Sequence, residues 1–178
     1  TSALLILALY TEVHHGLAKA HDLVRLATSQ RTGDLAMDLR GRFHHARIHY
    51  EQGLMAEAAE MADAGIALAE ETGLKWSMYG TELRFLRFLI HYVSGDWDQA
   101  EKVAAGFGMR VGTVHEAMLS SFALFVEVGR GRPTVASRLA WLRPFWDDPL
   151  PGYISRGMAA EHALWQGDPA AALDHVRP

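Results

Sequence analysis

Residues 42–53 read RFHHARIHYEQG, and residues 84–95 read RFLRFLIHYVSG. Six of the twelve aligned positions carry the same residue in both stretches. The shared positions are Arg42/Arg84, Phe43/Phe85, Ile48/Ile90, His49/His91, Tyr50/Tyr92 and Gly53/Gly95. Two related segments 42 residues apart indicate an internal repeat rather than an isolated chemical motif.

The glycine that ends each stretch also opens a second recurring segment. Four segments align on it: EQGLMAEAAEMA, VSGDWDQAEKVA, GRGRPTVASRLA and WQGDPAAALDHV. An alanine follows each glycine by five residues, at Ala58, Ala100, Ala136 and Ala172. Small residues at one place on a helix let a neighbouring helix approach closely. We therefore predict that these alanines are buried where the two helices of a pair cross.

The segments between glycine and proline joints are about 10 to 20 residues long, and their apolar residues recur with helical spacing. No segment alternates with period two for long enough to form a strand. The sequence predicts an all-α fold, a superhelical α-solenoid of about five antiparallel helix pairs. The predicted units are a degenerate pair at 1–33 and repeats at about 34–73, 74–112, 113–148 and 149–178. Both ends of this single solenoid segment read as cut from a larger chain.

The composition excludes several classes of function. The chain has 178 residues, a formal net charge of −4 and no cysteine. This charge argues against direct contact with nucleic acid, and the lack of cysteine excludes disulfides and fits a cytoplasmic protein. The apolar start TSALLILALY is too short to span a membrane, so it is interpreted as part of a buried helix at 2–14.

The order of small residue, turn glycine and alanines resembles the tetratricopeptide repeat, drawn out beyond its usual length of about 34 residues. In the first helices, seven positions before the glycine, stand Ala46, Phe88, Leu124 and Ala160. Endings such as GIALAEETG and the turn GDWDQAEKVA are similar to the helical sensor region of large LuxR-type, ATP-dependent (MalT-like) transcriptional regulators and related signalling ATPases. This resemblance implies a region that binds an inducer or a regulatory protein. It also implies self-association or contact with flanking domains outside this segment.

Histidines are the obvious candidates for a metal site. His45 and His49 are four residues apart and share a helix face, and a third ligand could come from Glu51, His14 or His15. However, His49 recurs as His91, which has no histidine or acidic residue four positions before it. We interpret these histidines as packing residues, with His44 at the surface or between repeats. The sequence therefore predicts no metal and no cofactor.

Carboxylates fall mainly on second helices and at helix starts, where they cap amides or face solvent. Asp96 and Asp98 are of this kind, and Thr113–Glu116 reads as a capping box. No pair of acidic groups faces a pocket, so no catalytic residue is predicted.

A concave groove is the preferred candidate site. In this repeat type the first helices line the concave side. The residues that the repeat register places on this side include several aromatic residues and two isolated charged residues. The predicted groove residues are Tyr10, Phe43, Arg47, Tyr50, Phe85, Tyr92, Phe125 and Glu161. The same rings would serve equally well as packing between helices, and that alternative stays open here.

The sequence thus favours a non-enzymatic domain of a bacterial regulator or signalling ATPase that binds a protein or small-molecule effector in this groove. A free-standing peptide-binding scaffold or adaptor is the alternative. A helical hydrolase with a His/Glu metal centre is the third reading.

Overall fold

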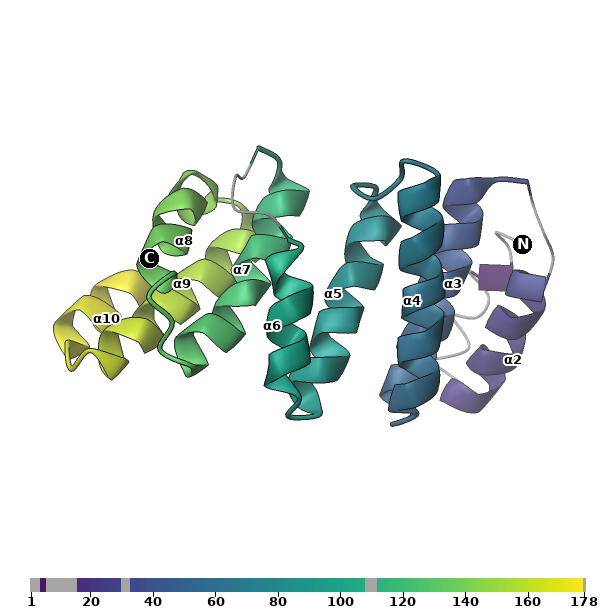
Figure 1. Cartoon of the computed structure of the whole chain (residues 1–178), viewed down its shortest axis with the longest axis horizontal. Coiled ribbons are helices and arrows are strands. Elements are labelled where there is room, and N and C mark those ends of the chain that lie inside the picture. The colour runs from purple at the N-terminus through teal and green to yellow at the C-terminus, as the bar shows by residue number, and fades with distance from the viewer. Residues whose placement is uncertain (1–3, 6–15, 30–32, 108–111, 178) are drawn as a thin grey trace. The chain divides into compact units, whose positions relative to one another are not determined.

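The computed structural model describes residues 4–5, 16–29, 33–107 and 112–177. Every regular element in these ranges is a helix, and the predicted all-α class is confirmed. The chain divides into two compact units, residues 1–94 and residues 95–178, and each is described by itself (Figure 1).

The first unit contains four helices within its described residues. They are α2 (Leu17–Ser29), α3 (Leu35–Glu51), α4 (Met55–Glu71) and α5 (Met78–Val93). Helix α3 packs against α2, α4 and α5, and α4 also packs against α5 (Figure 1). First helices therefore touch both their own second helix and the next first helix, as expected for stacked helix pairs.

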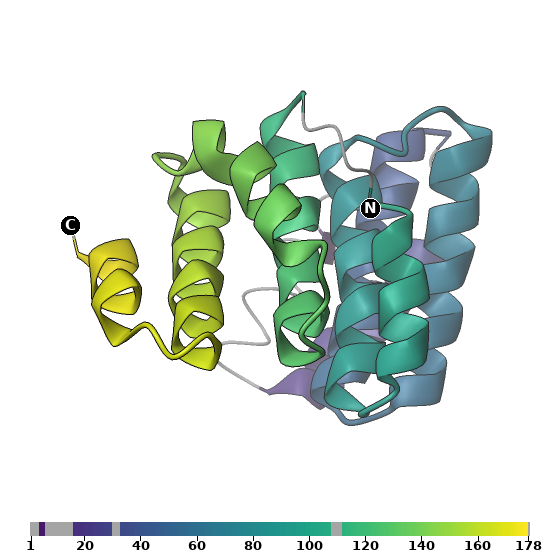
Figure 2. The same ribbon diagram turned by 60° about the vertical axis from the view of Figure 1, so that its left-hand side comes forward.

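The second unit contains the remaining helices. They are α6 (Trp97–Ala105), α7 (Val114–Gly129), α8 (Val135–Leu142), the 3₁₀ turn η1 (Arg143–Phe145), α9 (Pro149–Trp165) and α10 (Pro169–Val176). Helix α7 packs against α6, α8 and α9, and α10 lies beside α9 in both views (Figures 1 and 2). Helices α5 and α6, which the sequence analysis placed in one repeat at 74–112, fall in different units.

The joint glycines end helices through a left-handed residue. Gly53 has φ of +79°, its N–H donates to Tyr50 O at 3.0 Å, and Leu54 N–H donates to His49 O at 2.9 Å. This pair of bonds satisfies the last carbonyls of α3, and a side chain would strain such a backbone. Gly131 and Gly167 end α7 and α9 with the same two bonds. The repeated glycine is therefore a helix stop.

Small residues on α4 allow close packing, as the repeat predicted. Ala58, Ala62, Gly65 and Ala69 are all buried along one stripe of this helix. A Cβ atom added at Gly65 would lie 2.7 Å from Leu83 Cδ1, which leaves no room for a larger residue. The prediction of burial is also confirmed for Ala100, at 0% exposure, and for Ala172, at 5%.

The prediction is wrong for the third copy, where Ala136 is exposed and Val135 is fully buried. The other second helices start two residues after the joint glycine, whereas α8 starts four residues after Gly131. The residues Arg132 to Thr134 form an extra turn, closed by a bond from Val135 N to Arg132 O of 3.2 Å. Helix α8 is therefore rotated about its own axis relative to the other second helices. Its first buried residue lies four positions after the joint glycine instead of five.

Leucine substitutions test this difference. We expect Ala58→Leu to lower the free energy of unfolding by about 1–3 kcal/mol, because the crossing has no space for three more carbons. Ala136→Leu should stay within about 0.5 kcal/mol of the parent, as surface substitutions usually do. Urea denaturation followed by circular dichroism measures both. Similar losses at the two positions would contradict the register of α8.

Two further predictions concern the helix at 2–14 and the ability of any helix to span a membrane. Of the predicted helix 2–14 the structure describes Leu4 and Leu5, and Leu5 packs in a cluster with Val24 and Ile48. Within the described ranges, no helix has the length and apolar character needed to cross a membrane.

Candidate functional site

The first unit carries five of the predicted groove residues. Phe43, Arg47 and Tyr50 lie one helical turn apart on α3, and Phe85 and Tyr92 lie on α5, which packs against α3. All five residues are half-buried. The rings are therefore neither sealed in the core nor fully open to solvent.

Packing accounts for the buried part of these rings. Phe43 and Tyr50 contact the core cluster of the unit, and Phe43 lies 5.8 Å from the ring of Tyr79, measured between centroids. Tyr92 stacks on the buried Phe88 at 6.0 Å with an angle of 14° between the planes. The rings of Phe43, Tyr50 and Tyr92 are thus each packed on one side, which leaves the outer part of each in a defined position.

Arg47 is ion-paired with Glu51, one turn further along α3. The sequence analysis treated Arg47 as an isolated charge among the rings. The structure corrects this, because the pair presents a cation and an anion together at the edge of the aromatic residues. A partner would meet both charges.

The remaining three groove residues lie outside the described part of the first unit. Tyr10 lies outside the described residues. Phe125 and Glu161 belong to the second unit, where Phe125 is half-buried and 5.9 Å from Phe122. Glu161 is exposed and accepts a hydrogen bond from Trp165 Nε1 at 3.5 Å.

A cluster of three histidines lies on another face of α3. His45 and His49 meet His21 of α2, and the Nε2 atoms of His21 and His45 are 3.3 Å apart. The ring centroids are 5.2 Å apart for His21 and His45, 4.9 Å for His21 and His49, and 4.8 Å for His45 and His49. Helices α2 and α3 therefore bring three imidazoles into mutual contact.

His45 and His49 are held in their neutral form by their surroundings. Burial lowers the pKa of His45 to about 4, with further lowering by His49, His21 and Arg25. Burial and His21 also lower the pKa of His49, against an opposing effect of Glu57. At neutral pH both rings consequently keep a nitrogen lone pair, which is the form that ligates metals.

The sequence analysis missed His21. It considered Glu51, His14 and His15 as third partners of His45 and His49, and the last two lie outside the described residues. His21 and His45 are each twelve residues from Gly33, the joint between α2 and α3. In an antiparallel hairpin, residues equidistant from the turn face each other, so this symmetry was the available signal. His44, expected at the surface or between repeats, is buried, and its ring centroid lies 6.1 Å from that of Tyr79 in the next predicted repeat.

A cavity of about 640 Å³ opens beside the same helices. His45 contributes to its wall, with Arg25 of α2, Arg42 of α3 and Met61 of α4. None of the five groove residues of the first unit lines it. The cavity and the aromatic face are thus separate features of this unit.

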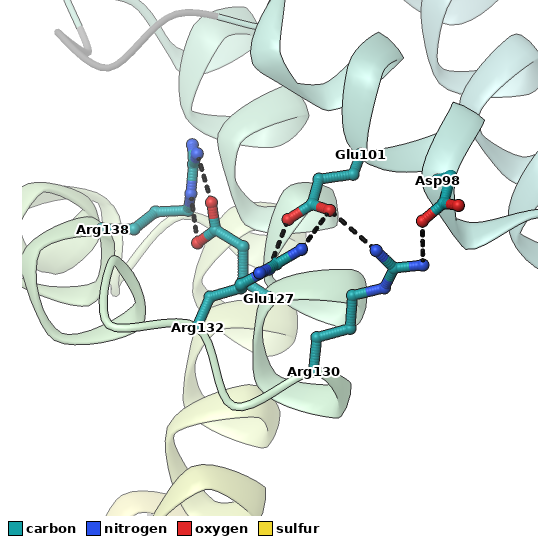
Figure 3. Close-up of polar contacts among 6 residues, drawn as sticks. All are labelled: Asp98, Glu101, Glu127, Arg130, Arg132 and Arg138. Atoms are coloured by element: carbon teal, nitrogen blue, oxygen red, sulfur yellow. Dashed lines mark hydrogen bonds and ion pairs between the residues drawn. The ribbon is translucent and has the colours of Figure 1, made fainter.

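The second unit holds a network of charged side chains (Figure 3). Glu101 of α6 accepts hydrogen bonds from Arg132 at 2.7 Å and from Arg130 at 2.9 Å, and Arg130 also binds Asp98 at 2.7 Å. The hydrogen bond from Arg132 is the main cause of a lowered pKa at Glu101, and that from Arg130 lowers the pKa of Asp98. These contacts fasten α6 to the turn between α7 and α8. Asp96 caps α6 as predicted, whereas Asp98 binds an arginine.

A second ion pair in this unit is buried. Arg138 of α8 donates from Nε and Nη2 to both carboxylate oxygens of Glu127 in α7, at 2.8 and 2.7 Å, and from Nη1 to Ser120 Oγ at 2.8 Å (Figure 3). The side chains are 4% and 11% exposed. The geometry is that of a structural clamp between two helices.

Trp146 is half-buried, and the guanidinium groups of Arg143 and Arg156 lie 4.9 and 5.5 Å from the centroid of its ring. The tryptophans that are exposed among the described residues are Trp165 on α9, at 71% exposure, and Trp76, at 40%.

Two solved structures have a similar fold. BtubC (BKLC) from P. vanneervenii superposes with a TM-score of 0.72 and 18% identity, over 97% of this chain and 75% of that chain. A kinesin light chain with nearly identical TPR-like repeats, from Podosopora anserina, gives 0.69 and 13%, over 98% of this chain and 90% of that chain. The sequence matches no protein-family model and no curated protein. The predicted tetratricopeptide-like fold is confirmed.

Proposed function

We propose that this chain is a non-enzymatic repeat scaffold that binds a protein partner along the face formed by α3 and α5. The observation that carries the proposal is the state of Phe43, Tyr50 and Tyr92, which pack against buried residues yet are partly exposed, with Phe85 half-buried as well. Rigid, partly exposed rings supply contact area at a low cost in side-chain entropy.

The chemistry of this face favours a peptide segment as the ligand. The rings lie on α3 and α5, two helices that pack against each other, whereas the cavity of the first unit is lined by residues of α2, α3 and α4 and by none of these rings. An extended apolar strip with an ion pair at its edge suits an amphipathic helix or strand, whose apolar side chains cover the rings. The Arg47–Glu51 pair would then meet polar groups at the margin of the contact.

We also propose the parent of this segment to be a LuxR-type, ATP-dependent regulator, for which the support is the style of the repeats. A free-standing scaffold is the second candidate, and the likeness to a kinesin light chain with TPR-like repeats favours it. Sequencing the reading frame on both sides distinguishes the two. The regulator requires a GxxxxGK[ST] loop upstream and a helix-turn-helix downstream, and a frame without either would exclude it.

Site-specific photo-cross-linking in the native host tests the binding face. With p-benzoylphenylalanine in place of Phe85 or Tyr92, we expect one discrete cross-linked product. The control position is Glu60, which is exposed on α4 and belongs to no part of the aromatic face. Phe85→Ala should then weaken binding of the identified partner by about tenfold or more, the loss expected for an aromatic anchor. Equal cross-linking from position 60, or none from 85 and 92, would refute the proposed face.

A further inference from the structure

The geometry of His21, His45 and His49 points to a binding site for one divalent transition-metal ion, represented here by Zn²⁺, that ties α2 to α3. Each residue offers a ring nitrogen, and the three ligand atoms lie within 4.8 Å of one another. Zinc binds imidazole nitrogen at about 2.0–2.1 Å, so two nitrogens of a tetrahedral site are about 3.3–3.4 Å apart. The Nε2 atoms of His21 and His45 already have this separation, at 3.3 Å.

The third ligand needs a small adjustment. His49 is one helical turn from His45, and its ring stacks on that of His45 with an angle of 24° between the planes. Its Nδ1 atom is buried and has no hydrogen-bond partner among the described residues. A rotation of this half-buried side chain is enough to complete a three-nitrogen face, since His45 and His49 sit on the same stripe of one helix.

The donor set determines which ion is accepted. Three imidazole nitrogens suit Zn²⁺, Co²⁺, Ni²⁺ or Cu²⁺, whereas Mg²⁺ and Ca²⁺ require oxygen ligands. Two other charged groups act on the cluster: Arg25 on His45 and Glu57 on His49. Arg25 is mostly exposed and 3.7 Å from the carboxylate of Asp22, so its repulsion of a bound cation is screened by solvent and by this partner.

The position of the site gives the ion a structural role. Within the described residues, α2 packs against α3, and the ligands come from both helices. A bound ion would therefore close the α2–α3 hairpin across its joint at Gly33. Metal binding to the folded state only would raise the melting temperature of the first unit.

Titration of the intact chain with Co²⁺ tests the site, because a tetrahedral nitrogen site gives visible absorption bands. Competition with Zn²⁺ then gives the zinc affinity. We expect one equivalent to bind the parent and the melting temperature to rise with Zn²⁺. His21→Asn should weaken binding by more than about 100-fold, because loss of even an outer-shell partner costs 10–100-fold.

Two variants control for general effects. The side chain introduced by His21→Asp has nearly the size of the one introduced by His21→Asn, but its carboxylate can bind the metal. This variant should therefore keep most of the metal affinity of the parent. His115→Asn removes an exposed histidine of α7 and should bind as the parent does. A second measurement needs no variant: Zn²⁺ should shift the imidazole ¹⁵N resonances of these three histidines. Absence of the cobalt bands and of these shifts in the parent, or equal binding by His21→Asn, would overturn the site.

Discussion

Glu127→Met should destabilise the protein by about 3–5 kcal/mol, because the substitution leaves the buried guanidinium of Arg138 without its counter-ion. Both carboxylate oxygens of Glu127 accept bonds from this arginine, and neither side chain has much access to water. The loss is measured by urea denaturation followed by circular dichroism, together with the melting temperature.

The double variant Glu127→Met/Arg138→Met is the matched control. Methionine fills most of the volume of either side chain without a charge, and replacing a complete buried pair by apolar residues is often neutral. We therefore expect the double variant to be clearly more stable than Glu127→Met alone. A single variant as stable as the parent would mean that Arg138 reaches solvent or another anion once Glu127 is gone.

Gly152→Ala should be the most disruptive single-methyl change in α9. A Cβ atom at this position would lie 2.2 Å from the carbonyl oxygen of Trp146 and 2.7 Å from its carbonyl carbon. Backbone atoms cannot rotate away as a side chain can, so η1 and the start of α9 must move apart. Overpacking of this kind costs about 1–3 kcal/mol and occasionally more.

Gly157→Ala in the same helix should stabilise the protein instead. An added Cβ atom meets nothing within 4 Å there, and the position is exposed. Alanine in a helix interior is about 0.5–1 kcal/mol more favourable than glycine, so this variant should melt above the parent. If both variants shift the melting temperature in the same direction, the close approach at Gly152 is incorrect.

Much of the fold was predictable because one local signal repeats. A glycine with positive φ follows each first helix from α3 onward, and the alanine five residues later marks the helix crossing in most copies, as Gly53 and Ala58 show. Ala136 was mispredicted because the position of a glycine fixes where one helix ends but not where the next begins. Pro133 and its neighbours insert a turn whose effect on helix rotation depends on three-dimensional packing.

The candidate site was predictable only in part. The helical register puts Phe43 and Tyr50 on one side of α3, whereas their degree of burial depends on neighbours such as Tyr79 that the register does not identify. The Glu127–Arg138 pair was missed although Glu127 is the sole charged residue between Ala117 and Val128 of α7. A charge in so apolar a helix requires a buried partner.

Because α8 starts late, the two helices of this repeat can change their surfaces independently during evolution. The joint at Gly131 ends α7 with the same hydrogen bonds as the joints at Gly53 and Gly167, so the end of the first helix is unchanged. The second helix, with its buried position moved by one residue, is turned by about 100° relative to its counterparts. A change in the length of this short turn therefore alters which residues of the second helix face outward. It does not alter the face of the first helix, on which a partner would lie. Natural selection can then alter one surface of such a repeat while it preserves the other.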